Sequence, residues 1–114
     1  MKNDVLNEAE LRERLDNDMT LLAELAAIFR EDYPPLLAKI GNAIARRDGP
    51  ALQESAHTLK GAVANFYAPL AVAAAGKLEY SGKISDFSSA GEDYARLQSC
   101  IEQVQIALAR LLAE

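Results

Sequence analysis

Hydrophobic residues recur every three or four positions along most of this 114-residue chain. That spacing places them on one face of an α-helix, which completes a turn every 3.6 residues. The pattern predicts a long helix that begins after Asn17 or Asp18 and ends at about Arg47. Pro34 and Pro35 fall inside it, but the spacing continues in phase across them, so we expect one kinked helix. Its predicted apolar face is formed by Leu22, Ala26, Phe29, Tyr33, Leu36 and Ile40.

Capping and helix-breaking residues mark the elements on either side of this long helix. Asn7, followed three residues later by Glu10, predicts a short N-terminal helix with Leu11 and Leu15 on one side. Asp48-Gly49-Pro50 ends the long helix and starts the next one, with the proline at the first helical position, where its missing N–H is harmless.

Three helices are predicted after this break. The first runs to about residue 66, and the second begins at Pro69 and ends at Ser81-Gly82. The third is capped by Ser88 or Ser89, with Glu92 close behind. The predicted inward positions are Leu52, Ala56, Leu59, Val63 and Phe66 on the first, Leu70, Ala74 and Leu78 on the second, and Leu97, Ile101, Val104, Leu108 and Leu111 on the third.

Composition favours an all-α fold, because alanine and leucine are abundant and only 6% of the residues are aromatic. Four substantial amphipathic helices with short connections predict an antiparallel up-down four-helix bundle with a short additional N-terminal helix. The length suits a single domain spanning residues 1–114.

Charge and hydropathy exclude several partners. The net charge of −5 gives no electrostatic support for binding nucleic acid or an anionic membrane. There is no apolar run of about 18 residues, and the start Met1–Asp4 lacks the apolar core of a signal peptide. The single Cys100 cannot form an internal disulfide, and we expect a half-buried structural side chain there. We therefore expect a cytoplasmic location, either as a free protein or as the cytoplasmic part of a membrane-anchored sensor kinase.

His57 is the only histidine, and it stands outside the apolar face of its helix. On a helical wheel it projects roughly 140° from the centre of that face, so the imidazole is predicted to be exposed. Lys60 lies three residues on, Gly61 four and Ala64 seven, while Gln53 lies four residues before. The small residues leave a low surface beside the ring that a second protein can approach.

This setting restricts the chemistry of the histidine. A zinc site needs three or four ligands, so one His and one remote Cys predict no metal site. A serine-type triad is not expected, because Ser55 and Thr58 point to different sides of the helix. Nucleophilic attack on phosphorus needs less: an imidazole that titrates near neutrality, and a cation such as Lys60 to offset the phosphate charge. No Walker-type loop is present, so we expect no ATP site of its own.

The run His57-x-Leu59-Lys60-Gly61 resembles the signature of histidine-containing phosphotransfer (HPt) domains, the four-helix carriers of multistep two-component phosphorelays. The resemblance extends from Phe29-x-x-x-x-Pro34 through Leu78-Glu79-x-x-Gly82 to the last helix. It implies that His57 accepts a phosphoryl group from a receiver-domain aspartate and passes it to another receiver. In each such pair, the receiver supplies the divalent cation. Many family members have a glycine at the site of Tyr67.

The resemblance implies response-regulator receiver domains as partners, with a hybrid sensor histidine kinase as a further candidate. The candidates to border the site are Gln53, Lys77 and Lys83. For Glu79, which matches the Leu-Glu pattern of the family, we expect a local structural role and a functional role equally. Two alternatives stay open: a helical adaptor bundle without covalent chemistry, and the phosphoryl-accepting module of a chemotaxis-type kinase.

Overall fold

The computed structural model describes residues 4–114, and within them the backbone forms five helices and no strand. The helices are α1 (Glu8–Arg14), α2 (Met19–Arg46), α3 (Gly49–Ala64), α4 (Pro69–Ile84) and α5 (Ala90–Leu112). The predicted all-α class is confirmed. Met1–Asn3, most of the segment inspected for a signal peptide, lie outside the described residues.

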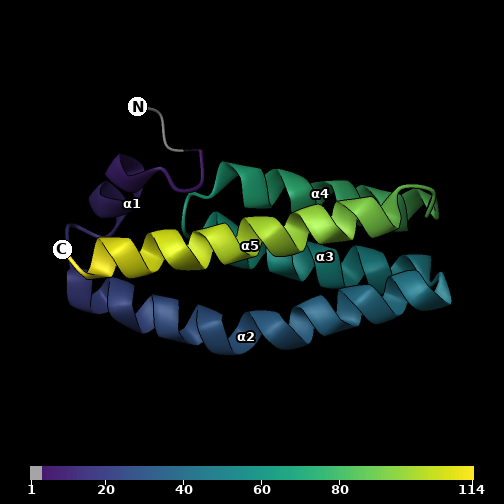
Figure 1. Ribbon diagram of the computed structural model, residues 1–114, viewed down its shortest axis with the longest axis horizontal. Coiled ribbons are helices and arrows are strands. Elements are labelled where there is room, and N and C mark those ends of the chain that lie inside the picture. Colours follow the sequence, from purple (N-terminus) through teal and green to yellow (C-terminus); the bar gives the residue numbers. More distant parts are fainter. Residues whose placement is uncertain (1–3) are drawn as a thin grey trace.

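Helices α2 to α5 form an elongated antiparallel bundle (Figure 1), and the molecule as a whole has principal extents of 42 × 28 × 19 Å. Each helix packs against two others: α2 and α4 both contact α3 on one side and α5 on the other. The most extensive of these contacts joins α3 to α4. Helices that follow one another in the sequence are therefore neighbours in space, which is the predicted up-down topology.

The short α1 closes one end of the bundle (Figure 1). Asn7 caps it as predicted, since its Oδ1 accepts from the Glu10 N–H at 3.2 Å and its Nδ2 donates to the Glu10 carboxylate at 3.0 Å. An ion pair of 2.8 Å joins Arg12 to Glu114, and the Asn7 N–H donates to the Tyr67 carbonyl at 2.7 Å. These bonds tie α1 to the end of α5 and to the turn after α3.

The long α2 confirms the prediction of one helix across Pro34 and Pro35, and its ribbon bends near the middle (Figure 1). Asp18 is its N-cap, and its carboxylate accepts from the Leu21 N–H at 3.0 Å. Of the six predicted inward positions, four are buried (Leu22, Ala26, Phe29 and Ile40), and the other two, Tyr33 and Leu36, are half-buried against the core.

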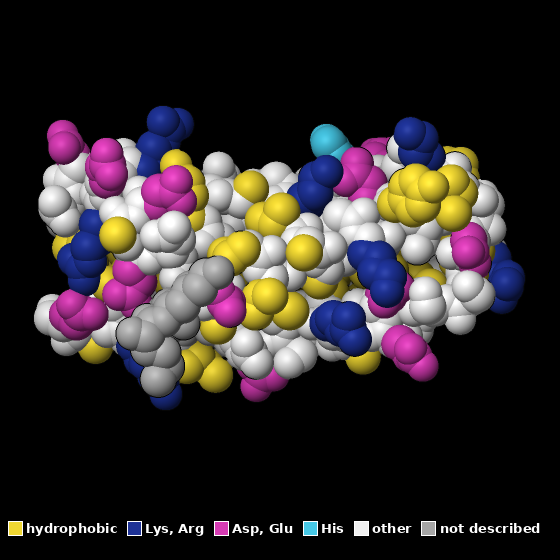
Figure 2. Space-filling view, turned by 90° about the horizontal axis from the view of Figure 1, so that it is seen from above, with side chains coloured by type: hydrophobic (Ala, Val, Ile, Leu, Met, Phe, Trp, Pro, Cys, Tyr) yellow, Lys and Arg dark blue, Asp and Glu magenta, His cyan; other side chains and the backbone are white. Residues whose placement is uncertain are grey.

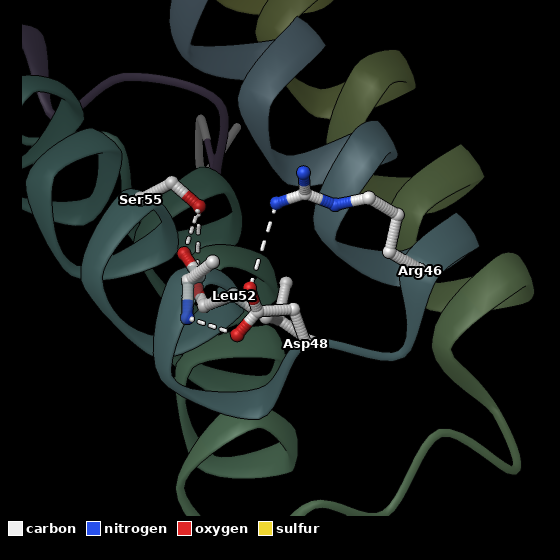
Figure 3. Close-up of polar contacts among 5 residues, drawn as sticks. Arg46, Asp48, Leu52 and Ser55 are labelled. Atoms are coloured by element: carbon white, nitrogen blue, oxygen red, sulfur yellow. Dashed lines mark hydrogen bonds and ion pairs between the residues drawn. The ribbon is translucent and has the colours of Figure 1, made fainter.

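Asp48 begins α3 by accepting a hydrogen bond from the Ala51 N–H at 3.1 Å, while its other oxygen lies 3.5 Å from Arg46 (Figure 3). Because Asp48 is the cap, Gly49 is the first helical residue and Pro50 is the second. The prediction that Pro50 comes first was therefore one residue late. The helix ends at Ala64, followed by a turn, rather than at about residue 66. All five predicted inward positions are buried.

Two predictions about α4 were wrong. Leu70 was expected to face inward, but it is 47% exposed, and its neighbour Ala71 is buried instead. The helix was expected to end at Ser81-Gly82, but it continues to Ile84 and is followed by a residue in the left-handed conformation, Ser85. Gly82 is buried inside the helix, where it packs against α3 and does not act as a terminator.

The last helix, α5, buries all five of its predicted inward residues. Ser89 precedes it, but its hydroxyl donates to the Asp93 carboxylate at 3.1 Å and does not cap a backbone N–H. Glu92 is exposed. Cys100 is half-buried as expected, and burial raises the pKa of its thiol, which keeps it protonated and unreactive.

Candidate functional site

His57 projects from the outer side of α3, and 67% of its side chain is exposed. Figure 2 shows the imidazole standing clear of the surface, beside acidic and basic side chains. The predicted exposure is confirmed. Burial of the flanking Ala56 and Leu59 holds this part of α3 against the core, so the ring projects from a rigid helix.

Glu79 of α4 joins His57 to Lys60. One of its carboxylate oxygens lies 2.7 Å from His57 Nδ1, and the other lies 2.6 Å from the Lys60 ammonium. The Glu79 side chain is only 20% exposed, whereas Lys60 is 34% exposed. The packing of α3 on α4 thus places the Glu79 carboxylate against the imidazole, and the second oxygen of this carboxylate binds the Lys60 ammonium.

These contacts fix the charge of Glu79. The hydrogen bond from Lys60 lowers the pKa of the Glu79 carboxyl below its ordinary value of 4.5, and the bond with His57 lowers it further, although burial opposes both. The carboxylate is therefore ionised at neutral pH and can only accept hydrogen bonds.

An ionised carboxylate also selects the tautomer of the ring that it contacts. His57 Nδ1 must carry the hydrogen that it donates to Glu79, so in the neutral ring Nε2 keeps its lone pair. The site thus leaves Nε2 as the ring nitrogen with a free lone pair.

The serine and threonine nearest to His57 in sequence are turned away from it. Ser55 is buried, and its hydroxyl donates to the Ala51 carbonyl at 2.7 Å (Figure 3). The Thr58 hydroxyl donates to the Glu54 carbonyl at 3.1 Å. Neither hydroxyl is bonded to the imidazole, so the geometry does not assemble a serine-type triad.

Comparison with known proteins identifies the family of the chain. The protein-family model described as "Hpt domain" matches residues 24–107, which is most of the chain. The chain belongs to the Hpt family. Hpt domains exchange phosphoryl groups with the receiver domains of response regulators, and the chain is accordingly a histidine-containing phosphotransfer carrier and not a kinase.

The Hpt fold is also seen in a solved structure. The crystal structure of histidine-containing phosphotransfer protein B (HptB) from Pseudomonas aeruginosa PAO1 is similar, with a TM-score of 0.74 and 23% sequence identity. The similarity covers 99% of this chain and 94% of HptB. No curated protein is significantly similar in sequence.

The small residues beside His57 are open to solvent. A β-carbon built on Gly61 would meet nothing within 4 Å, and Ala64 is exposed. Gly61 therefore does not serve a close contact with another helix of the bundle. Gln53 is half-buried and lines a shallow hollow together with His57 and Glu79.

The two other candidate lysines are both carried by α4 but point in different directions. Lys77 forms an ion pair of 3.0 Å with Asp93 of α5, so it is directed to the opposite side of α4 and does not border the site. Lys83 is exposed and follows Glu79 by one helical turn. Lys83 therefore lies near the side of α4 that carries Glu79.

Tyr67 shows why a glycine is common at its position in the Hpt family. Its φ of 53° is in the left-handed region, which glycine adopts without a steric cost. The tyrosine is half-buried against the core, so side-chain packing offsets the backbone cost.

Residues 4–114 contain no group of three His, Cys, Asp or Glu side chains that could hold a metal ion. Across the same residues, every helix is too short or too polar to cross a membrane.

Proposed function

We propose that His57 is the phosphoryl acceptor and donor of this Hpt domain, and that Nε2 is its reacting atom. The observation that carries the proposal is the bond between Nδ1 and Glu79, which leaves Nε2 as the exposed nitrogen of a side chain that is 67% exposed. The remainder of the ring environment is compatible with in-line attack, because Gly61 leaves open space one turn away.

In the proposed transfer, the lone pair of Nε2 attacks the phosphorus of a receiver's aspartyl phosphate. The nitrogen–phosphorus bond forms as the bond from phosphorus to the aspartyl oxygen breaks, and the aspartate leaves as a carboxylate. The hydrogen on Nδ1 stays in place and continues to bond with Glu79. In the reverse reaction, the aspartate of a second receiver attacks the phosphorus and takes the phosphoryl group from His57.

Glu79 and Lys60 support the two charged parts of the phosphorylated ring. The phosphorylated imidazole with a hydrogen on Nδ1 is an imidazolium with a positive charge, which the Glu79 carboxylate, 2.7 Å from Nδ1 before transfer, stabilises. Lys60 lies one helical turn from His57 and offers a cation to the phosphoryl oxygens. Its bond of 2.6 Å to Glu79 holds the ammonium near the ring before the phosphate arrives.

The receiver is proposed to dock over the low surface beside the imidazole, formed by Gly61 and Ala64, with Gln53 and Lys83 at its edge. Gly61 and Ala64 add little height, so an aspartyl phosphate can approach Nε2 to the roughly 3–3.5 Å that transfer requires.

The phosphoryl group is proposed to come from a phosphorylated partner and not from ATP. The chain supplies the nucleophile, while the receiver contributes its acidic pocket and the divalent cation. A receiver domain, either free or joined to a hybrid sensor histidine kinase, is the expected partner, and the exchange is expected in the cytoplasm.

The test is to incubate the purified protein with receivers charged by acetyl phosphate. We expect phosphate on the protein that is labile in acid and stable in base, and a phosphorus NMR signal of the Nε2-phosphohistidine isomer. His57→Gln should abolish the signal, and the matched neighbour variant Thr58→Ala should retain it. Absence of phosphate across a broad panel of receivers would favour the adaptor function instead.

A further inference from the structure

The side chain of Lys60 reaches Glu79 by crossing over Gly76 of α4. A β-carbon built on Gly76 would lie 3.6 Å from Lys60 Cδ. Two atoms further along the side chain, Lys60 Nζ lies 2.6 Å from Glu79 Oε1. Gly76 and Glu79 are three residues apart and share one face of α4. The aliphatic stem of Lys60 therefore lies across a position of α4 that carries no side chain.

Lys60 is the neighbour that a side chain at position 76 would meet. Gly76 is half-buried, and among the described residues Lys60 Cδ is the one atom within 4 Å of the added β-carbon, apart from the neighbours of Gly76 in its own helix. Gly82 differs, because its β-carbon would meet the backbone of α3, and Gly61 differs, because its β-carbon would meet nothing. Glycine is less favourable than alanine inside a helix. At position 76, the contact that it leaves room for is the one with Lys60.

The separation of 3.6 Å limits the size of the side chain that position 76 can hold. It is an ordinary contact distance between two carbon atoms, so the methyl group of alanine fits beside the Lys60 stem. A β-branched side chain extends two further groups beyond its β-carbon, and its χ1 angle is too stiff in a helix to turn both of them away. Such a side chain would push the Lys60 stem off its path to Glu79.

The path matters because a lysine side chain is long and flexible. It loses much of its rotational freedom when its ammonium is fixed in one place. The Lys60 side chain is 34% exposed, so much of its stem already lies against the protein. Because this ordering precedes the arrival of the phosphate, the ammonium can offset the phosphoryl charge with little further loss of freedom.

We propose that Gly76 is a positioning residue for phosphoryl transfer, because the space above its backbone holds the Lys60 stem where the ammonium lies beside Glu79 and His57. Gly76 acts through Lys60 and contacts no reacting atom. The proposal rests on the proposed function of His57 and adds a residue to its site. The position of the ammonium then depends on two helices, since α3 carries the lysine and α4 supplies both its path and its carboxylate partner.

The first test is the pKa of the Glu79 carboxyl, followed by a carbon NMR titration that needs no receiver. Lys60 and His57, both of α3, are the charged groups that lower this pKa below 4.5, and the hydrogen bond from Lys60 is the largest cause. Gly76→Val should therefore raise the pKa of Glu79, as Lys60→Ala does, whereas Gly76→Ala should keep it low. Gly91→Val, in open space on α5, should leave it unchanged.

The second test is a double-mutant cycle on phosphoryl transfer from a charged receiver at low salt. Gly76→Val should slow transfer by the same factor as Lys60→Ala, roughly 1.5 to 5. In the Lys60→Ala background, Gly76→Val should cause no further slowing, because the side chain through which Gly76 acts is gone. A change that merely disturbed the packing of α3 on α4 would slow transfer in both backgrounds. Gly76→Thr has the same branched shape as Gly76→Val and serves as the second variant, and urea unfolding shows that each variant is folded.

Three results would overturn the proposal. If Gly76→Val and Gly76→Thr leave the pKa of Glu79 as low as in the parent, the Lys60 stem does not need this path. If they raise it but transfer at the parent's rate, the path has no part in the reaction. If they slow transfer equally with and without Lys60, the receiver or the helix packing meets position 76 directly. All three leave the proposed function intact, which fails only if the parent itself accepts no phosphate.

Discussion

The contact between α3 and α4 is closed at one end, whereas the outer side of α3 near its other end is open, and a glycine marks each region. At the closed end, a β-carbon on Gly82 would collide with the backbone nitrogen of Gln53 and lie 2.7 Å from the Gly49 carbonyl oxygen. In the open region, a β-carbon on Gly61 would have nothing within 4 Å. Gly82 thus allows α3 and α4 to pack closely, whereas Gly61 faces no other part of the protein.

The difference shows where each glycine is needed. A glycine inside a helix is less stable than alanine by roughly 0.8–1.0 kcal/mol. At Gly82 close helix packing offsets this cost, and that packing sets the separation at which Glu79 reaches His57 and Lys60. At Gly61 no contact inside the protein offsets it, so the benefit lies in what a partner meets beside the imidazole.

The largest effect in the open region should come from the histidine itself. His57→Gln is expected to abolish phosphoryl acceptance completely while changing the free energy of unfolding by less than about 0.5 kcal/mol, because the side chain is 67% exposed. Receiver-dependent phosphorylation and urea unfolding, measured on the same preparation, check both parts. A large loss of stability would show that the imidazole supports the bundle as well as the chemistry.

Adding one methyl group to each glycine tests the comparison directly. Gly82→Ala should destabilise the protein by about 1–3 kcal/mol, because the methyl group forces the backbones of α3 and α4 apart. Gly61→Ala should instead stabilise it by roughly 0.8–1.0 kcal/mol. Thermal or urea unfolding of the two variants gives the answer, and shifts of the same sign would remove the distinction between the two regions.

A longer side chain at Gly61 separates docking from folding. Gly61→Gln should fold normally, since its side chain enters open space, but should slow phosphoryl acceptance by roughly tenfold to a hundredfold by holding the receiver away from Nε2. Gly91→Gln is a suitable control, because Gly91 is equally open but lies on α5. Undiminished transfer in a stable Gly61→Gln protein would refute the docking role of this surface.

The helices differ in how well the sequence predicted their buried faces. Periodicity located the inward faces of α3 and α5, because each has a single apolar face. It failed at Leu70, because α4 has apolar residues on two sides and the spacing alone does not say which one is buried. Gly82 was taken as a helix end because glycine often terminates helices, whereas its reason for being there is a contact with a different helix.

In the candidate site, the features that depend on one helix could be predicted from the sequence, whereas the contact between two helices could not. The exposure of His57 and the proximity of Lys60 follow from spacing within one helix. The contact with Glu79 joins residues 22 positions apart on two helices, so it depends on how closely and in which register α3 and α4 pack. Only the resemblance of Leu78-Glu79 to the family pattern pointed to this carboxylate.

Replacing the half-buried Glu79 should produce a moderate, pH-dependent loss of stability. The pKa of Glu79 is lowered in the folded protein, so its ionised form adds stability above the ordinary value of 4.5, and this stability is lost as the pH falls through the lowered pKa. Glu79→Gln should therefore be less stable than the parent at pH 7 and indistinguishable from it in acid below that pKa. Urea unfolding across this range is the measurement, and a difference that persists in acid would contradict the assigned cause.

The smallest effect is expected from Lys60, because its ammonium is partly exposed and is shared between Glu79 and the incoming phosphate. Partly exposed ion pairs contribute about 0.2–1 kcal/mol, which corresponds to a factor of roughly 1.5 to 5 in a rate. Lys60→Ala should slow transfer or shorten the phosphohistidine lifetime by such a factor at low salt, and the difference should shrink as salt screens the charge. Lys60→Arg keeps the cation and should recover most of the loss. If Lys60→Ala and the parent transfer at the same rate at low salt, the lysine serves only to hold Glu79 in place, and the open region depends on His57 and Glu79 alone.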